Sequence, residues 1–300
     1  MRIVLAGATG FLGGLLRERL GTTHELVLLT RQPRGTDGVT EVTWHPDGTA
    51  GSWAHAIDGA DAVVNLAGEP LVGHRWSSAR KAALVASRIE PTRSLVAAID
   101  QSSARPRVLI SASAVGYYGP HGDEVLTEDT PAGHDFLASL CVEWENAALA
   151  AEALGTRVVT IRTGLVLSEK GGALKPMLLP FRLGLGGPIG SGAQYWPWIH
   201  ADDWSGIVEF LLDQPTVSGA VNLTALTPVT NAAFAKTLGG VLSRPAILPA
   251  PRFALRALLG EVADAVLLSG QRAEPRRAIA LGYRFAYEDL ESALRQILRR

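Results

Sequence analysis

The residues with the clearest chemical signature form a glycine-rich turn near the start of the chain. Gly7, Gly10 and Gly13 follow the apolar run Arg2–Ala6 with the spacing GxxGxxG, and a helical pattern, Gly14–Leu20, comes next. The first glycine permits a tight turn, the second lets backbone approach a pyrophosphate, and the third lets a helix pack on the strand. The N-terminus of that helix offers N–H groups and a positive dipole end to phosphate. The turn therefore predicts a dinucleotide site made by Gly7, Thr9, Gly10, Phe11, Leu12 and Gly13.

The end of the second predicted strand, Glu25–Thr30, indicates which dinucleotide is bound. An NAD-binding protein normally places Asp or Glu there to accept a hydrogen bond from the ribose 2′-hydroxyl. This chain has Arg31 instead, and a guanidinium suits a 2′-phosphate. Arg34 can assist, whereas the alternative is a surface arginine without a ligand. We therefore expect NADP(H) as the cofactor, with Thr30 and Arg31 contacting it.

The elements that position these residues alternate between strands and helices in the first half of the chain. Five short apolar runs are predicted to be buried strands: Arg2–Ala6, Glu25–Thr30, Ala62–Leu66, Arg107–Ser111 and Arg157–Ile161. Helical spacing occupies Gly13–Leu20, Ser77–Asp100 and Phe136–Leu154 between them. Such alternation predicts an α/β fold with a doubly wound parallel sheet and right-handed crossovers.

The pattern changes after about Leu167. Residues 171–192 are rich in Gly and Pro and predict a long irregular connection, which is usually functional. The tail is mostly helical, with predicted helices at Asn231–Leu242, Phe253–Leu259, Val262–Leu268 and Tyr287–Leu298. We therefore expect an NADP-binding Rossmann domain at 1–167, with a further strand and helix from about 200–226. The substrate-cleft region would be 168–300, ending in a smaller helical module at 249–298.

The composition limits the class of protein. A formal net charge of −1 gives no overall field toward nucleic acid or an anionic membrane. Cys141 is the only cysteine, so neither an intramolecular disulfide nor a cysteine-based metal site is expected. No apolar stretch reaches the roughly 18 residues of a membrane span, and Met1 leads directly into a strand, which leaves no room for a signal peptide. We expect a soluble cytoplasmic protein without a metal, a nucleic-acid partner or a membrane partner.

Several longer motifs extend this interpretation over nearly the whole chain. They are GATGFLGG at 7–14, NLAGEP at 65–70, SRIEPT at 87–92, SASAVGYYG at 111–119, RTGLVL at 162–167, the block at 180–203 and GYRFAYEDLESAL at 282–294. In these motifs the chain resembles the extended short-chain dehydrogenase/reductases. Within them it is similar to the atypical epimerase family 39U-like branch, whose members are called nucleoside-diphosphate-sugar epimerases or cell-division inhibitors. The resemblance implies that Leu66, Ala67 and Gly68 line the adenine side of the cofactor. It places Arg88 where relatives contact the dinucleotide, and the alternative for Arg88 is a solvated helix face.

The resemblance also exposes a departure from the superfamily. Active relatives use a serine or threonine with a YxxxK pair, whose lysine lowers the tyrosine pKa while the tyrosine exchanges the proton that accompanies hydride transfer. No lysine of this chain lies four residues after a tyrosine. Depending on the register, the tyrosine position holds Phe136 or Leu137, and the lysine position holds Leu140 or Cys141.

Three residues near the end of the fourth strand are candidate replacements. Ser113 lies close to the superfamily's catalytic serine, where it can bond a substrate carbonyl or cap a turn. Tyr117 and Tyr118 follow, and they either supply a phenol or pack as rings over the nicotinamide pocket, which we favour. A nucleophilic Cys141 is disfavoured because no basic partner is evident.

Other polar groups admit two interpretations. His200, Asp202 and Asp203 resemble an acid/base or metal cluster, but we favour a structural role in which an aspartate caps the next helix. Three glutamates, Glu69, Glu143 and Glu145, would be bases if burial raised their pKa. The Pro180–Gly192 block, with Arg182 and the aromatic cluster at 195–198, is expected to shape a substrate cleft above the strand ends.

Two functions follow from these residues. The first is an NADP(H)-dependent oxidoreductase or epimerase-like enzyme on a small carbonyl or sugar-nucleotide substrate. The second, favoured by the missing YxxxK pair, is a non-catalytic NADP(H)-binding protein that senses redox state or regulates a partner. The chain is expected to be a monomer, or a homodimer formed through the two long helices at about 77–100 and 136–154.

Overall fold

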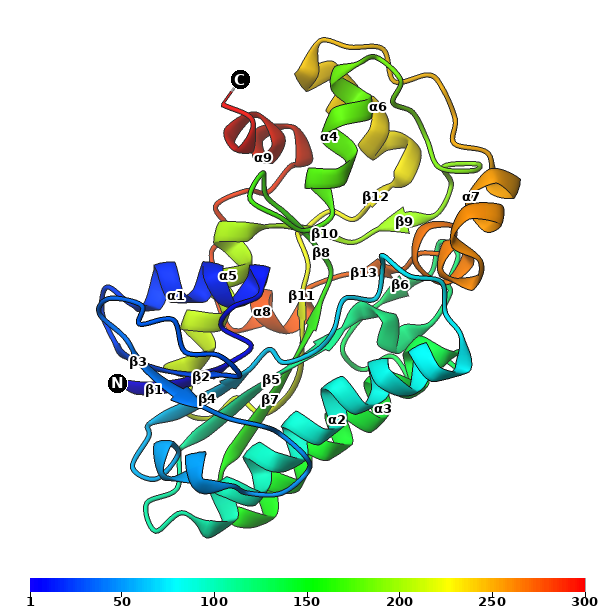
Figure 1. The fold of residues 1–300 in the computed structure, drawn as a ribbon. Helices are drawn as coiled ribbons and strands as arrows, with labels where there is room; N and C mark the ends of the chain where they lie inside the picture. Colours follow the sequence, from blue (N-terminus) through cyan, green and yellow to red (C-terminus); the bar gives the residue numbers. More distant parts are fainter. Residues whose placement is uncertain (300) are drawn as a thin grey trace.

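Seven parallel strands form the central sheet of the computed structural model, which describes residues 1–299 (Figure 1). The strands are β1 (Arg2–Ala6), β2 (Glu25–Thr30), β3 (Thr40–Thr43), β4 (Ala62–Asn65), β5 (Val108–Ala114), β7 (Arg157–Thr163) and β11 (Gly219–Leu223). Their order across the sheet is β11-β7-β5-β4-β1-β2-β3. The chain therefore reverses its direction of winding between β1 and β4, which is where such sheets bind ligands at the carboxyl ends of their strands. The predicted doubly wound parallel sheet is confirmed.

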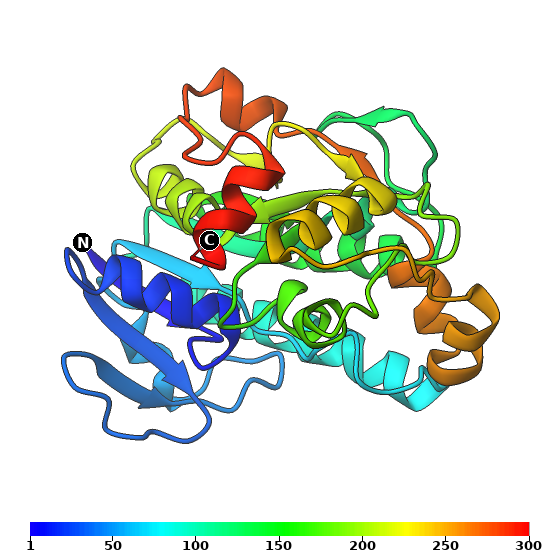
Figure 2. The same ribbon diagram turned by 90° about the horizontal axis from the view of Figure 1, so that it is seen from above.

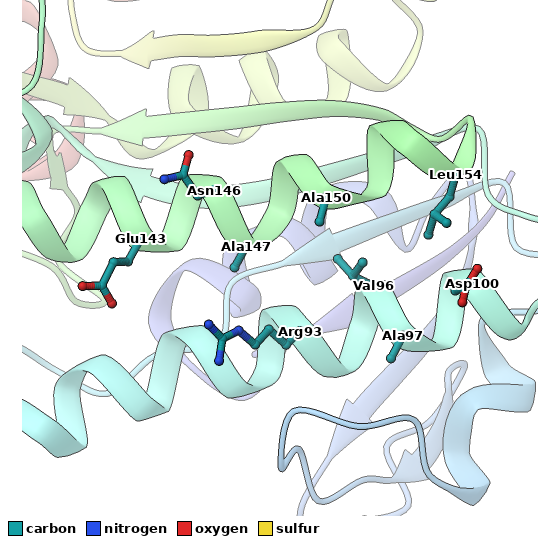
Figure 3. A pocket seen from close by; sticks show the side chains of 9 residues that line it. All are labelled: Arg93, Val96, Ala97, Asp100, Glu143, Asn146, Ala147, Ala150 and Leu154. Carbon is teal, nitrogen blue, oxygen red and sulfur yellow. The ribbon is translucent and has the colours of Figure 1, made fainter.

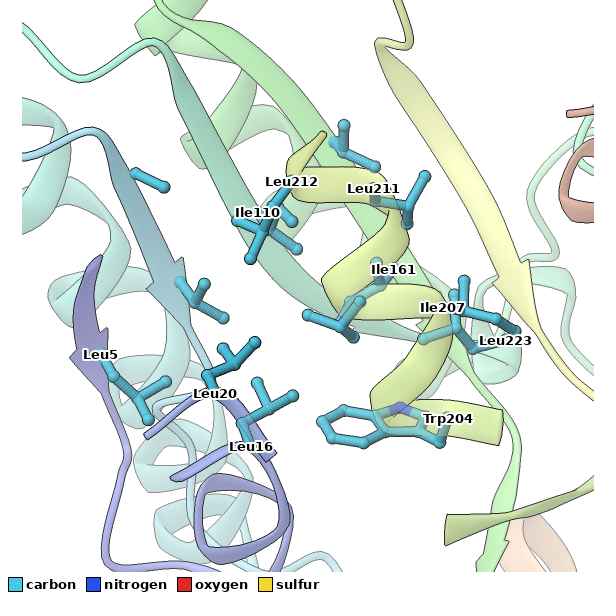
Figure 4. Packing of buried hydrophobic residues seen from close by; sticks show 14 of the residues in the cluster. Leu5, Leu16, Leu20, Ile110, Ile161, Trp204, Ile207, Leu211, Leu212 and Leu223 are labelled. Carbon is cyan, nitrogen blue, oxygen red and sulfur yellow. The ribbon is translucent and has the colours of Figure 1, made fainter. Parts of the chain in front are cut away.

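Helices cover both faces of this sheet. On one face α1 (Phe11–Leu20) and α5 (Ala201–Leu212) pack against the strands. Figure 4 shows Leu16, Leu20 and Trp204 of these helices meeting Ile110 and Ile161 of the sheet. The long helices α2 (Ser78–Gln101) and α3 (Phe136–Leu149) lie side by side on the other face (Figures 1 and 2). Such burial on both faces explains why the strands are nearly continuous apolar runs.

A second, smaller lobe follows β7. Its core is formed by α4 (Leu174–Arg182), α6 (Asn231–Leu242) and α9 (Leu290–Ile297) with the short strand pairs β8 (Leu165–Leu167)–β10 (Trp198–His200) and β9 (Tyr195–Trp196)–β12 (Val229–Thr230). Trp196, Trp198 and Phe234 are buried at its centre. The remaining elements are α7 (Arg252–Leu259), α8 (Arg276–Ala280), the strand pair β6 (Val125–Leu126)–β13 (Arg272–Ala273) and short turns of helix at 52–56, 115–118, 150–154 and 263–267.

The structure corrects two of the expected elements. The segment 171–192 is not wholly irregular, because α4 occupies Leu174–Arg182 within it. Its buried residues Leu174, Leu178 and Phe181 are spaced by one helical turn, and this packing prevails over Pro180, while Pro176 lies in the first turn, where proline is tolerated. The last helix begins at Leu290 rather than at Tyr287, because Asp289 caps it by accepting a hydrogen bond from the Ser292 N–H.

Candidate functional site

The glycine turn after β1 has the geometry that a dinucleotide requires. Gly7 has a φ of +81°, and a Cβ there would lie 2.6 Å from the backbone carbonyl of Leu66. A Cβ on Gly13 would lie 2.6 Å from Cα of Ala8, so only glycine lets α1 approach the turn this closely. Gly10 is exposed at the N-cap of α1, and its N–H donates to the Gly7 carbonyl at 3.1 Å. The first turn of α1, from Phe11, therefore directs its unpaired N–H groups outward as a phosphate cradle.

The residues after β2 favour a phosphate over a ribose hydroxyl. Thr30 is buried, and its hydroxyl accepts a hydrogen bond from the Gln32 N–H at 3.3 Å, which closes the turn. Arg31 is exposed and has no carboxylate within 4 Å among residues 1–299. Glu41, the acid on the neighbouring strand, bonds instead to the Gly35 N–H at 2.9 Å and to the Thr36 hydroxyl at 2.6 Å. Arg31 is thus left free to pair with an anionic ligand.

The loop after β4 forms the other wall of the turn. Leu66 donates its N–H to the Ala6 carbonyl at 2.9 Å, which places residues 66–68 beside the glycine turn. Asn65 holds this loop from beneath, because its side-chain oxygen accepts from the Ala67 N–H at 3.1 Å and its amide donates to Thr92 at 2.8 Å. Asn65 was not among the predicted site residues, and only its place in the NLAG motif pointed to it.

Arg88 is neither on a solvated helix face nor free to reach outward. Its side chain is buried on α2, donating to the Leu84 carbonyl at 3.0 Å and to the Glu69 carbonyl at 2.8 Å. A Cβ on Gly68 would lie 3.2 Å from the Arg88 side chain, so Gly68 allows this close approach. Arg88 therefore fixes the backbone at 68–69, next to the cofactor wall.

The face of α3 turned toward β5 shows which of the candidate residues for the tyrosine and lysine positions lie at the strand end. Leu137 packs beside Gly116, and Cys141 lies against Ser113 and the Ala114 backbone. Phe136 instead packs edge-on against Trp76, with ring centroids 5.2 Å apart. The four-residue spacing that faces the strand end is therefore Leu137 and Cys141. Burial raises the pKa of the Cys141 thiol to about 12, so this cysteine is not a nucleophile at neutral pH.

A buried ion pair lies one turn further along the same face. Arg162 on β7 makes two hydrogen bonds of 2.9 Å to the Glu145 carboxylate, and both side chains are less than a tenth exposed. Burial lowers the pKa of Arg162, but the bonds to Glu145 outweigh it and raise that pKa above its ordinary value. Ser113 donates its hydroxyl proton to Glu145 at 2.6 Å. Ser113 is therefore held in one orientation by a carboxylate that Arg162 neutralises.

The two tyrosines of the strand end are tied to the same ion pair. The Arg162 guanidinium stacks 3.4 Å from the centre of the Tyr117 ring. Tyr118 is fully buried and donates its hydroxyl proton to Asn222 at 2.6 Å while it accepts from Arg162 at 3.1 Å. Burial raises the pKa of Tyr118 to about 12. Both rings pack around Arg162, and the Tyr118 phenol has its partners within the protein.

The His200 cluster is structural, although not in the way expected. His200 itself caps α5, because its Nδ1 accepts from the Asp202 N–H at 3.0 Å, and neither aspartate caps the helix. Asp203 is buried and accepts from the N–H groups of Ala286 and Tyr287 at 2.8 and 3.0 Å, which joins α5 to the C-terminal segment. Among residues 1–299 no three acidic, histidine or cysteine side chains are grouped to hold a metal ion.

The other candidate side chains lie apart from the strand end. Glu69 is exposed and pairs with Arg80, and Arg182 pairs with Glu169 at 2.9 Å on the end of α4. Glu143 lines a cavity of about 620 Å³ between α2 and α3, which Figure 3 shows together with Arg93 and Asp100. This cavity extends toward the end of α2 remote from the glycine turn, so it is not the cofactor site.

A second cavity, of about 400 Å³, adjoins the buried ion pair. It lies beside α3 and is lined by Tyr117, Glu128, Glu145, Arg162 and Arg277, among others. One carboxylate oxygen of Glu128 accepts from the Asn222 N–H at 3.0 Å, and the other is buried without a partner. The cavity thus gives the Ser113–Glu145 pair a polar neighbourhood on the side of α3.

Comparison with known proteins identifies this arrangement. Residues 3–223, more than half of the chain, match the model of the NAD dependent epimerase/dehydratase family. The chain belongs to this family. Residues 250–297 match a separate domain of unknown function, DUF1731, so this member of the epimerase family carries α7 and the elements after it as an additional module.

Relatives of full length refine the assignment within the epimerase family. The chloroplastic SDR39U1 homolog of Arabidopsis thaliana is 43% identical over 305 residues, covering 100% of this chain and 87% of the relative. Epimerase family protein SDR39U1 of Mus musculus is 40% identical over 304 residues, covering 99% of this chain and 100% of the relative. The crystal structure of human SDR39U1 (isoform 2) with NADPH superposes with a TM-score of 0.90 at 38% identity, covering 100% of this chain and 99% of that one. The resemblance noted from the sequence motifs is confirmed.

Proposed function

We propose that this protein binds NADP(H) at the glycine turn and uses it in an oxidoreductase or epimerase-like reaction on a small carbonyl or sugar-nucleotide substrate. The observation that carries the proposal is Arg31, an exposed and unpaired guanidinium where an NAD-binding protein has a carboxylate. The NADPH in the human relative supports the same choice.

The residues around the turn fit this cofactor. We propose that the N–H groups of Phe11 and Leu12 bind the pyrophosphate, with Thr9 and Gly10 alongside. Arg31, next to Thr30, would bind the 2′-phosphate in a charge-assisted pair. The adenine would rest against Leu66, Ala67 and Gly68, whose backbone Arg88 holds in place. When bound, NADPH supplies the hydride.

Ser113 is the residue that we propose acts on the substrate. Leu137 and Cys141 occupy the tyrosine and lysine positions, and neither side chain exchanges a proton at neutral pH. Ser113 bears a hydroxyl at the carboxyl end of β5, fixed by Glu145. In this proposal the Ser113 hydroxyl turns its one proton from Glu145, which keeps its bonds to Arg162, to the substrate carbonyl, and the new hydrogen bond stabilises the negative charge that develops on the carbonyl oxygen.

A non-catalytic NADP(H)-binding protein is the second candidate. The observation in its favour is that Leu137 and the buried Cys141 are both chemically inert. Such a sensor would bind NADPH tightly and consume none of it, whatever carbonyl compound is offered.

Calorimetric titration with NADP⁺ and NAD⁺, repeated on Arg31→Ala, tests the cofactor proposal. We expect NADP⁺ binding to weaken by roughly 1.5–3 kcal/mol in the variant, the worth of a charge-assisted contact. Arg284→Ala removes an exposed arginine elsewhere and is the matched control. Equal affinity for the two nucleotides in the unmodified protein would contradict the proposal. A screen of carbonyl compounds for NADPH oxidation, with Ser113→Ala alongside, then separates the enzyme from the sensor.

For the assembly we propose a cytoplasmic homodimer formed through α2 and α3. The half-buried side chains that line the cavity between these helices include Val96, Ala97 and Ala147, which are small and apolar enough for a close helix contact. Light scattering after gel filtration should give twice the chain mass, and Ala147→Arg should halve it. A monomer in the unmodified protein contradicts this part of the proposal.

A further inference from the structure

The exposed apolar side chains of this protein are concentrated in two segments of the chain. Nine large hydrophobic residues are exposed among residues 1–299, and seven of them come from two segments. These seven are Leu179, Leu183, Leu185, Ile247, Leu248, Phe253 and Leu258. The exposed fractions of Ile247, Phe253 and Leu258 are 77%, 76% and 72%, so these side chains have almost no cover from the chain itself. Such a concentration marks an interaction site.

The two segments lie side by side and form one surface. Arg244 donates to the Arg182 carbonyl at 3.0 Å, the Leu248 N–H donates to Gly186 at 3.1 Å, and the Gly190 N–H donates to Ala250 at 2.9 Å. Helix α7 continues this surface, and none of its eight residues is buried. Figures 1 and 2 show the segment from α6 to α7 running beside the one that follows α4. We call this surface, residues 175–191 and 244–258, the docking face.

The docking face also carries an excess of positive charge, although the whole chain is nearly neutral. No Asp or Glu occurs in residues 170–201 or 214–260, which contain three and four Lys or Arg residues respectively. Of the five cations on the docking face, Arg182 and Arg256 pair with Glu169 and Asp264 at its edge, whereas Lys175, Arg244 and Arg252 have no carboxylate within 4 Å among residues 1–299. Although the formal net charge is −1, the charged residues are unevenly distributed along the chain. Cations without a carboxylate partner lie among the exposed apolar side chains of this face.

We propose that the docking face binds the surface of an anionic phospholipid bilayer. Phe253, Leu258 and Ile247 would enter the boundary between headgroups and acyl chains, and the arginines would extend along them to the phosphates. Each cation near an anionic surface adds attraction that salt screens. No helix among residues 1–299 combines the length and apolar character to cross a bilayer, so the binding is peripheral. This inference revises the expectation, drawn from overall charge, of no membrane partner.

The charge distribution argues against a second copy of the chain as the occupant. A two-fold contact would place Lys175, Arg244 and Arg252 opposite the same three cations, with no acidic residue in either segment to balance them. Neither of the two cavities described above is lined by a residue of this face. A flat anionic, lipid-rich surface satisfies both the apolar and the cationic character.

Co-sedimentation of the full chain with vesicles tests the proposal. We expect binding to phosphatidylcholine vesicles that contain phosphatidylglycerol, and little binding to phosphatidylcholine alone. Phe253→Ser with Leu258→Ser should raise the dissociation constant at least ~10-fold, because two inserted side chains are lost. Ile279→Ser and Val72→Ser, the two exposed apolar residues outside the face, are the matched controls and should change nothing. Circular dichroism on each variant establishes that it is folded.

A second pair of variants tests the electrostatic contribution to vesicle binding separately from the apolar one. Arg244→Glu with Arg252→Glu should abolish the preference for phosphatidylglycerol, as should high salt. Equal binding to the two kinds of vesicle, no binding to either, or an equal loss in Ile279→Ser would overturn the proposal. If the mass in solution rises with concentration and Phe253→Ser prevents this without any vesicle binding, the face is a self-association surface and the proposal is wrong.

Discussion

Removal of the Arg162 side chain should destabilise this protein more than most single substitutions do. In Arg162→Met the Glu145 carboxylate stays buried and loses both hydrogen bonds of its only ion-pair partner. Breaking a buried pair from one side costs about 3–5 kcal/mol. Arg162 also donates to the Tyr118 hydroxyl and the Glu128 carbonyl, and each lost bond adds about 0.5–1.5 kcal/mol. The total, roughly 4–8 kcal/mol, is a large share of the about 5–15 kcal/mol that stabilises a typical domain.

Urea unfolding followed by tryptophan fluorescence and by circular dichroism measures this loss. The double variant Arg162→Met/Glu145→Leu should recover most of it, because no charge is then left buried, and should lie within about 2 kcal/mol of the unmodified protein. The difference between the double variant and the sum of the single ones gives the coupling of the pair. A loss below about 1 kcal/mol in Arg162→Met, or a double variant equal to the sum, would refute the idea that this pair holds the strand end.

Three further outcomes follow from the structure. Gly13→Ala should abolish NADP⁺ binding in calorimetry, since its Cβ would press on Ala8 and displace α1 from the turn, whereas Gly14→Ala, with open space around its Cβ, should bind normally. Arg88→Leu should weaken NADP⁺ binding about 10-fold through the lost bond to Glu69, and an unchanged affinity would contradict this role. Burial lowers the pKa of His200, so the free energy of unfolding should be steady above pH 6.5 and fall as the pH drops below it; His200→Asn should flatten this profile.

The parts of the site that the sequence could predict are those made by neighbouring residues. The glycine turn and Arg31 lie within one strand, turn and strand, where local spacing fixes their relative positions. Helix α4 was missed because Pro180 and the surrounding glycines disfavour helix locally, while its stability comes from burial of Phe181 and neighbouring apolar residues in the smaller lobe.

Long-range pairs were beyond prediction for a physical reason. Nothing in the local pattern shows that Glu145 on α3 meets Arg162 on β7, or that Asn65 on β4 meets Thr92 on α2, because these contacts depend on how helices cross the sheet. The exposure of side chains to solvent was equally beyond prediction from the local pattern. The absence of acids from residues 214–260 is visible in the chain itself, but only the packing shows that α7 leaves its apolar side chains uncovered.

The register of α3 has a consequence for attempts to convert this protein into a conventional reductase. Grafting tyrosine at Leu137 and lysine at Cys141 would place an ammonium group in a closed space between the Glu145 carboxylate, which Arg162 already neutralises, and the buried Arg88. Because Glu145 is already paired, the two cations in this buried site would repel each other, and the lysine would lose its proton or push α3 outward. These two substitutions alone are therefore not expected to restore the tyrosine–lysine proton transfer of the superfamily. Restoring this proton transfer would also require Arg88 to move, which would break its hydrogen bond to the Glu69 carbonyl in the loop after β4.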